Sequence, residues 1–176
     1  METIAGYMAR DHARLDQLLR KSFADPAHPD PDCYREFRKG LLRHIAIEEK
    51  ILLPAIASRM GAPHPAAQRI RLDHGAIAAL LVPPPSSKIL QALRWILAGH
   101  NALEESDGGV YAGASALQGE AGEKLMRSVL DFPEVPLAPS IGRRDTLEAA
   151  RRALHRAGYD FDSIIQHTND HKPVKD

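Results

Sequence analysis

Cysteine is almost absent from this chain of 176 residues, in which Cys33 is the only one. A single cysteine excludes an intramolecular disulfide and any zinc or iron–sulfur site built on a cysteine cluster. The chain also lacks an apolar run of the roughly 18–20 residues that span a bilayer, and its first residues lack the apolar core of a signal peptide. An excess of positive charge is missing as well, because 23 lysines and arginines balance 23 aspartates and glutamates. We therefore expect a cytoplasmic protein that binds neither membranes nor nucleic acids.

Aromatic residues make up only 5% of the chain, and no segment alternates polar and apolar residues as a strand does. Proline and glycine instead divide the chain into segments of helical length. The sequence thus predicts an all-α fold, an up-down four-helix bundle with additional C-terminal helices. The expected helices span about 3–24, 31–60, 65–82, 87–108, 115–131 and 146–158.

Capping residues support several of these boundaries. Asp30 before Pro31 is typical of a helix start, and Ser86 or Ser87 is a good N-cap after three consecutive prolines. Pro54 lies inside the second helix, where it removes a backbone donor, so we expect a kink there.

The chain divides into residues 1–131, which form the bundle, and 132–176, a proline-rich connection followed by a helical extension. The extension begins a short helix at Thr146, its expected N-cap, and stops it at Gly158. Its apolar face consists of Leu147, Ala150, Leu154 and Ala157. This face either docks on the bundle or contacts a second copy of the chain or another protein.

Histidine is the unusual residue type, with nine in the chain. On the second and fourth helices, the residues spaced three and four apart form a mainly apolar face. Each of these two faces contains a histidine followed four residues later by a glutamate, at corresponding positions in the two helices. The first and third helices each carry one histidine on an otherwise apolar face. The chain is therefore two copies of one helix pair. The six positions are His12, His44, Glu48, His74, His100 and Glu104.

A histidine and a glutamate four residues apart lie on one face of a helix, so both pairs point at one region of the core. Two carboxylates are costly to bury without a cation, and no lysine or arginine lies on the four faces. A metal ion resolves the difficulty, and a purely structural histidine network is the alternative. Imidazole and carboxylate donors without thiolate indicate iron or manganese, and bridging carboxylates suit two metals, with a solvent bridge and an open position for a small molecule.

These motifs resemble the hemerythrin-like (HHE cation-binding) domain family over about residues 1–112, with 131 as the alternative end of the resemblance. The motifs that carry the resemblance are Asp11-His12, His44 to Glu49, Asp73-His74 and His100 to Glu105. The resemblance implies a four-helix bundle around a non-haem di-iron centre, its two irons bridged by a solvent-derived oxygen. The implied ligands are His12, His44, Glu48, His74, His100 and Glu104.

The chain departs from the oxygen-carrying hemerythrins at two positions. Those proteins have a further histidine four residues after the one on the third helix, where this chain has Ala78. They place their last carboxylate at the position of Glu105. The set of four histidines and two glutamates is more similar to that of di-iron proteins for iron–sulfur cluster repair and of eukaryotic iron-sensing hemerythrin-like domains.

The sequence favours a binding protein, in which the site takes O2, NO, peroxide or iron itself for carriage, sensing or storage. A di-iron enzyme for iron–sulfur cluster repair or for removal of peroxide or NO is the alternative, and a structural bundle with zinc or no metal is a third. No catalytic residue and no binding motif for a further cofactor accompanies the six ligands.

Other polar residues near the motifs receive lesser roles. Glu49 and Glu105 lie about 100° around the helix from the bridging glutamates, so they are expected to support ligands or face solvent. Asp107 is expected at the helix end, with binding of a water in the pocket as the alternative. Tyr111 is expected at the periphery of the core, with donation to a bound diatomic molecule near the open position as the alternative. The remaining histidines are expected at the surface; they are His28, His64, His155, His167 and His171.

Overall fold

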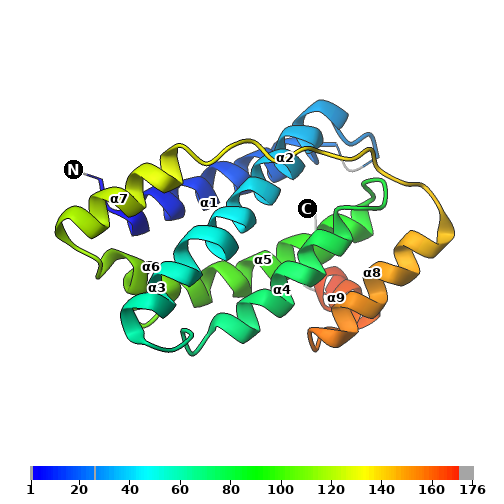
Figure 1. The fold of residues 1–176 in the computed structure, drawn as a ribbon. Helices are drawn as coiled ribbons and strands as arrows, with labels where there is room; N and C mark the ends of the chain where they lie inside the picture. The colour runs from blue at the N-terminus through cyan, green and yellow to red at the C-terminus, as the bar shows by residue number, and fades with distance from the viewer. Residues whose placement is uncertain (1, 26, 171–176) are drawn as a thin grey trace.

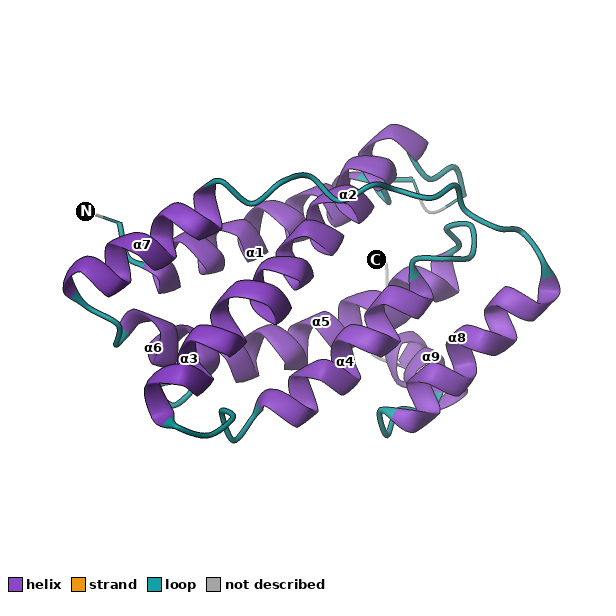
Figure 2. Ribbon diagram, viewed as in Figure 1, coloured by secondary structure: helices purple, strands orange, loops and turns teal. Residues whose placement is uncertain are grey.

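A computed structural model describes residues 2–25 and 27–170, and within these ranges every regular element is a helix (Figures 1 and 2). The all-α prediction is therefore confirmed for the described residues. The elements are α1 (Ile4–Lys21), α2 (Pro31–Ile47), the π-helix η1 (Glu48–Leu52), α3 (Leu53–Met60), α4 (Ala67–Leu80), α5 (Ser87–Glu105), α6 (Val110–Ser115), α7 (Gly119–Leu130), α8 (Arg144–Arg156) and α9 (Phe161–Asp170). In the described part of the chain, none of these helices is long and apolar enough to cross a membrane.

The expected caps of α2 and α5 are present. The Asp30 carboxylate accepts hydrogen bonds from the backbone N–H groups of Asp32 and Cys33, and the Ser86 hydroxyl accepts one from Ile89. Gly61 ends α3 in the left-handed conformation, with a φ of 71°, which costs a glycine little.

The irregularity expected at Pro54 takes the form of a π-helix directly before it. The Leu53 N–H bonds the carbonyl of Glu48, five residues earlier, and Pro54 then lies in the first turn of α3. Because Pro54 has no N–H and its ring crowds the preceding turn, the wider π turn accommodates it without ending the run of helix.

Helix α1 packs against α2 and α5, and α4 packs against α5 (Figure 1). Each of these helices carries a buried histidine between apolar residues that belong to two separate core clusters. On α1, for example, Met8 belongs to one cluster and Leu15 to the other, with His12 between them. The histidines therefore form a polar layer inside an apolar core, where water is excluded and charge is costly.

The segment after α5 differs from the prediction. A helix over about 115–131 was expected, and α7 covers most of this range, but the short α6, which ends where that range begins, was not expected. Gly119, in the left-handed conformation with a φ of 62°, begins α7. The short α6 packs on α1, α3 and α5.

The C-terminal extension contains two helices and docks on the chain's own core. Helix α8 contacts α4, and α9 contacts α5. The N-cap of α8 is Arg143, so the prediction of Thr146 was wrong: its hydroxyl donates to the carbonyls of Ile141 and Arg143 instead. Helix α9 was missed because its sequence is polar, although Phe161, Ile164 and Ile165 are buried. A contact of this extension with a second copy or another protein stays a prediction.

Candidate metal centre

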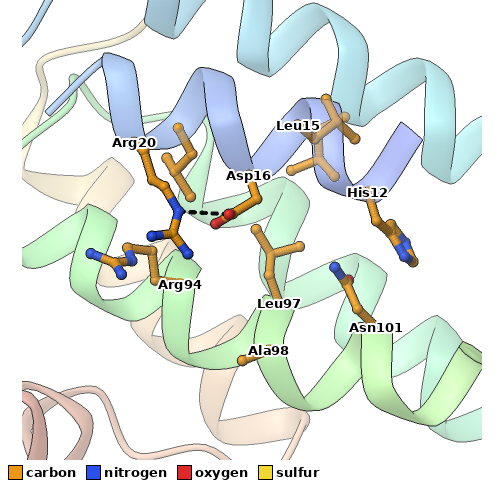
Figure 3. A pocket seen from close by; sticks show the side chains of 10 residues that line it. His12, Leu15, Asp16, Arg20, Arg94, Leu97, Ala98 and Asn101 are labelled. Carbon is orange, nitrogen blue, oxygen red and sulfur yellow. Dashed lines mark hydrogen bonds and ion pairs between the residues drawn. The ribbon is translucent and has the colours of Figure 1, made fainter. Parts of the chain in front are cut away.

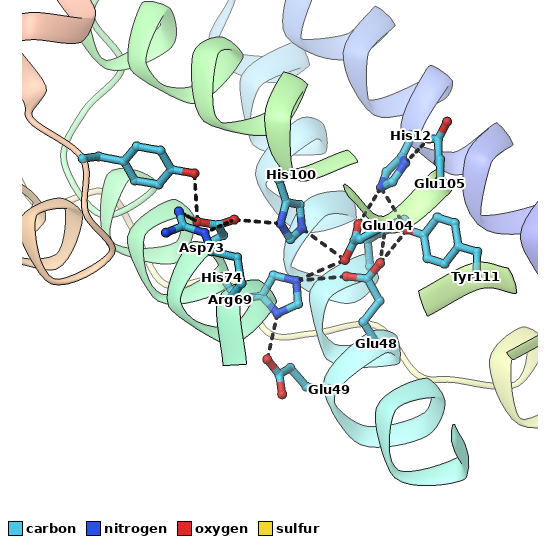
Figure 4. Close-up of polar contacts among 12 residues, drawn as sticks. His12, Glu48, Glu49, Arg69, Asp73, His74, His100, Glu104, Glu105 and Tyr111 are labelled. Carbon is cyan, nitrogen blue, oxygen red and sulfur yellow. Dashed lines mark hydrogen bonds and ion pairs between the residues drawn. The ribbon is translucent and has the colours of Figure 1, made fainter. Parts of the chain in front are cut away.

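The structure brings together all six residues predicted as metal ligands. Figure 4 labels five of them, which are His12, Glu48, His74, His100 and Glu104. They come from α1, α2, η1, α4 and α5, and all six side chains are buried. Their donor atoms form two groups, in each of which the atoms lie within 4.8 Å of one another. The first group is His12, His44, Glu48 and Glu104, and the second is Glu48, His74, His100 and Glu104. We call these residues the inner six. Both glutamates are shared, so the groups are adjacent.

The Nε2 atoms of the four histidines face the two glutamates. In the first group, His44 Nε2 lies 3.1 Å from Glu48 Oε1, and His12 Nε2 lies 3.4 Å from Glu104 Oε2. In the second group, His74 Nε2 lies 3.1 Å from Glu48 Oε2, and His100 Nε2 lies 3.3 Å from Glu104 Oε1. Each glutamate thus turns one oxygen to each group, as a carboxylate bridging two cations would.

The opposite ring nitrogen, Nδ1, of every histidine faces a carboxylate from a neighbouring helix. Three of these contacts are hydrogen bonds of 2.6–2.8 Å, and the fourth, between His100 and Asp73, is an ion-pair distance of 3.5 Å. The pairs are Asp11 with His44, Glu49 with His74, Asp73 with His100 and Glu105 with His12. We call these four acids the outer carboxylates. A carboxylate on Nδ1 fixes the ring and leaves Nε2 free for a metal.

One outer carboxylate connects the site to the C-terminal extension. Asp73 is ion-paired with Arg69 and accepts a hydrogen bond of 2.9 Å from the hydroxyl of Tyr159, which follows α8. Arg69 also donates to the carbonyl of Ala157. The extension therefore holds the acid that faces His100.

The electrostatics of the inner six call for positive charge. Burial opposes ionisation of Glu48, but His44 and His74 hold its pKa well below the usual range. Burial also opposes the charged form of His44, but Glu48 and Asp11 outweigh it and raise the pKa of His44 to about 10. The pKa of His74 rises to about 11 against the effect of burial, with Glu104 the largest favourable contributor. Protons meet the need for cations in the metal-free chain, and a metal ion would replace them.

Buried atoms without a hydrogen bond indicate that the donor set fits a metal. Glu48 Oε2, His74 Nε2 and Glu104 Oε1 are buried and lie at ion-pair distances, but none of them has a hydrogen-bond partner. All three belong to the second group. Buried polar atoms in proteins are almost always paired, and imidazole with carboxylate is a donor set that suits iron, manganese or zinc.

Tyr111 is the site residue that the sequence interpretation misplaced. It was assigned to the core periphery, yet its hydroxyl lies among the donors of the first group and donates to Glu48 Oε1 at 2.6 Å. Burial, with the charges of Glu48 and Glu104, raises the pKa of Tyr111 well above the usual value, so the phenol keeps its proton in the metal-free chain. The turn at Gly108-Gly109 ends α5, as expected, but α6 then returns Tyr111 to the site.

The remaining assignments are mostly confirmed. Glu49 and Glu105 support histidines, and Asp107 is exposed in the turn after α5. His64 is an exception, because it is buried and its Nδ1 accepts from the backbone N–H of Ala66. Three other histidines are exposed as expected, and His171 lies outside the described residues; the exposed ones are His28, His155 and His167.

A cavity of about 270 Å³ reaches the first group at His12 (Figure 3). Its walls near the site are mainly apolar and include Leu15, Leu41 and Leu97. Asp16, Arg20 and Arg94 also line it. A small molecule could approach His12 through this space.

Comparison with known proteins gives no further guide, since no family model, no curated protein and no solved structure matches this chain.

Proposed function

We propose that this protein is a hemerythrin-like four-helix bundle that holds two iron ions and binds a small molecule, O2 or NO, or iron itself. The observation that carries the proposal is the pair of buried donor groups that share Glu48 and Glu104. Two shared carboxylates suit two adjacent ions better than one. The helices α1, α2, α4 and α5, with η1, would supply the bundle that encloses them.

Each residue of the site has a definite task in this proposal. The inner six would hold the ions, and the outer carboxylates would keep each histidine ring in the orientation that binds metal. The apolar layers on either side exclude water, which strengthens the charge interactions inside. When bound, the di-iron centre would supply redox chemistry and exchangeable positions for a small molecule. The cavity at His12 supports access for such a molecule. We place the protein in the cytoplasm, as its single cysteine suggests.

Metal analysis with an optical spectrum tests the proposal. The chain is purified without air, its metal content is measured, and its spectrum is recorded before and after exposure to O2. We expect two irons per chain and a new absorption band that disappears when O2 is removed. A Glu48→Ala, Glu104→Ala double variant, which lacks both shared carboxylates, is the control and should hold no iron.

Other results would change the proposal in defined ways. Two irons that oxidise irreversibly or dissociate would favour turnover or iron delivery over reversible binding. Zinc alone, or no metal at all, would contradict the di-iron proposal and leave a structural helical protein.

A further inference from the structure

The hydroxyl of Tyr111 points toward the donors of the first group (Figure 4). Its side chain is 1% exposed, and it reaches the group from α6, which carries none of the inner six. The hydroxyl oxygen contacts one donor atom of every member of the group. These contacts are 2.6 Å to Glu48 Oε1, 3.0 Å to His12 Nε2, 3.0 Å to His44 Nε2 and 3.2 Å to Glu104 Oε2.

These separations are those of neighbouring ligands on one metal ion. Ligand bonds of about 2.1 Å that meet at right angles place adjacent donor atoms about 3 Å apart. The four contacts of the Tyr111 oxygen lie around this value, so the oxygen is positioned as a neighbour of all four donors. Tyrosine oxygen is a known ligand of iron in proteins.

The second donor group lacks this feature. Its atoms Glu48 Oε2, His74 Nε2 and Glu104 Oε1 have no hydrogen-bond partner, whereas the first-group oxygens of the same two glutamates contact Tyr111. The repeated helix pairs therefore produce two groups that each contain two histidines and the two shared glutamates. Only the first group also contacts the hydroxyl of Tyr111.

We propose that the Tyr111 oxygen is a fifth protein ligand of the metal position formed by the first group. This inference rests on the proposed function, because it assumes that a metal occupies that group. One metal position then has five side-chain ligands and the other has four.

Ferric iron and phenolate give a visible charge-transfer band, which tests the assignment directly. The intact chain is loaded with Fe(II) without air and oxidised, and its iron content, visible spectrum and resonance Raman spectrum are recorded. We expect two irons, a phenolate-to-iron band, and tyrosine vibrations enhanced by excitation in that band. Tyr111→Phe should lose the band and the enhanced vibrations and still bind close to two irons per chain, because the inner six are intact.

Tyr34→Phe is the matched control. Tyr34 is also buried in a helix, and its hydroxyl has no hydrogen-bond partner, but it lies in the apolar cluster with Phe37 and away from the inner six. This variant should keep the band at full strength.

The outcomes separate this inference from the proposed function. Two irons without a phenolate band in the unmodified chain would overturn the role of Tyr111 and leave the di-iron proposal standing. One iron without the band would mean that the hydroxyl fills the first position and excludes a metal there. No iron would overturn both. Because these results come from the unmodified chain, they do not depend on the folding of a variant.

Discussion

At the scale of single residues, each of the four sequence motifs contains two adjacent residues whose side chains have different tasks. One member belongs to the inner six and faces the centre, and the adjacent outer carboxylate faces a histidine on another helix. Neighbouring residues of a helix point about 100° apart, so a single side chain cannot do both. Each doublet therefore supplies one of the inner six and one outer carboxylate. The four contacts between outer carboxylates and histidines join α1 to α2, η1 to α4, α4 to α5 and α5 to α1, and so form a closed ring.

The Glu104-Glu105 doublet gives the sharpest prediction at this scale. Glu104→Ala should abolish binding of both irons, because its carboxylate is common to the two groups. Glu105→Ala removes only the hydrogen bond to His12 Nδ1, so iron affinity should fall by about 10- to 100-fold while saturating iron still gives two ions per chain.

Iron titrations followed by metal analysis distinguish the two effects. His74→Ala, which removes a donor of the second group only, should lose the iron of that group. Glu123→Ala, at an exposed position of α7, is the control and should bind iron normally. Equal loss of iron in Glu104→Ala and Glu105→Ala would mean that the roles within the doublet are wrongly assigned.

The sequence predicted the assembly of the inner six but not the fifth contact from Tyr111. Periodicity could place His12, His44 and their counterparts because each lies on a regular α-helix, and it could place Glu48 because the π-helix begins only at that residue. Tyr111 follows a break at two glycines, and periodicity is lost across a break. The partner of each outer carboxylate was also out of reach, because it depends on how neighbouring helices pack.

At the scale of elements, the turn between α5 and α6 decides where Tyr111 lies. A Cβ on Gly109 would stand 2.3 Å from the carbonyl oxygen of Glu104 and 2.6 Å from that of Leu103, whereas nothing lies within 4 Å of a Cβ on Gly108. Only Gly109 is therefore required for the close return of the chain.

Gly109→Ala should destabilise the fold by about 1–3 kcal/mol, because the new methyl group overlaps backbone atoms that cannot move independently. Gly108→Ala is the matched control and should change the free energy of unfolding by less than about 0.5 kcal/mol. Chemical denaturation followed by circular dichroism measures both. Equal stability of the two variants would show that the turn has another conformation in solution.

The element boundaries that could be predicted are those with local chemistry, such as the caps at Asp30 and Ser86. The N-cap of α8 and the existence of α9 could not be predicted in the same way. Helix α9 is stabilised by burial of Phe161 and Ile164 against α5 and α8, which is a tertiary effect.

The docked C-terminal helices give a stability prediction of their own. Leu154 on α8 is fully buried in the core cluster that includes Leu80 and Leu93, so Leu154→Ala should lower the free energy of unfolding by about 2–5 kcal/mol. Leu130→Ala, at a helical leucine that is 53% exposed, should have a small effect. Urea denaturation of the two variants provides the measurement. A small effect of Leu154→Ala would mean that the extension is not part of the cooperative core.

At the scale of the whole molecule, the polar layer conflicts with the apolar core that surrounds it. Two buried carboxylates repel each other, and the protons on His44 and His74 offset their charge in the metal-free chain. Burial of this layer does not add to the hydrophobic stabilisation from the two apolar clusters. The layer therefore lowers the stability of the fold unless a cation occupies it. Because the inner six come from helices far apart in sequence, an ion bound there would link α1, α2, η1, α4 and α5.

Metal removal should therefore lower the melting temperature of the entire domain. An ion that binds only the folded chain at 100 times its dissociation constant adds about 2.7 kcal/mol per site, which corresponds to roughly 5–10 °C for a chain of this length. Calorimetry of the iron-loaded and chelator-treated protein measures the shift. The Glu48→Ala, Glu104→Ala double variant should have the same melting temperature with and without iron, because it lacks both shared carboxylates. If removal of iron left the melting temperature of the unmodified chain unchanged, iron would not connect these helices. The donor groups would then have to be explained as a protonated hydrogen-bond network.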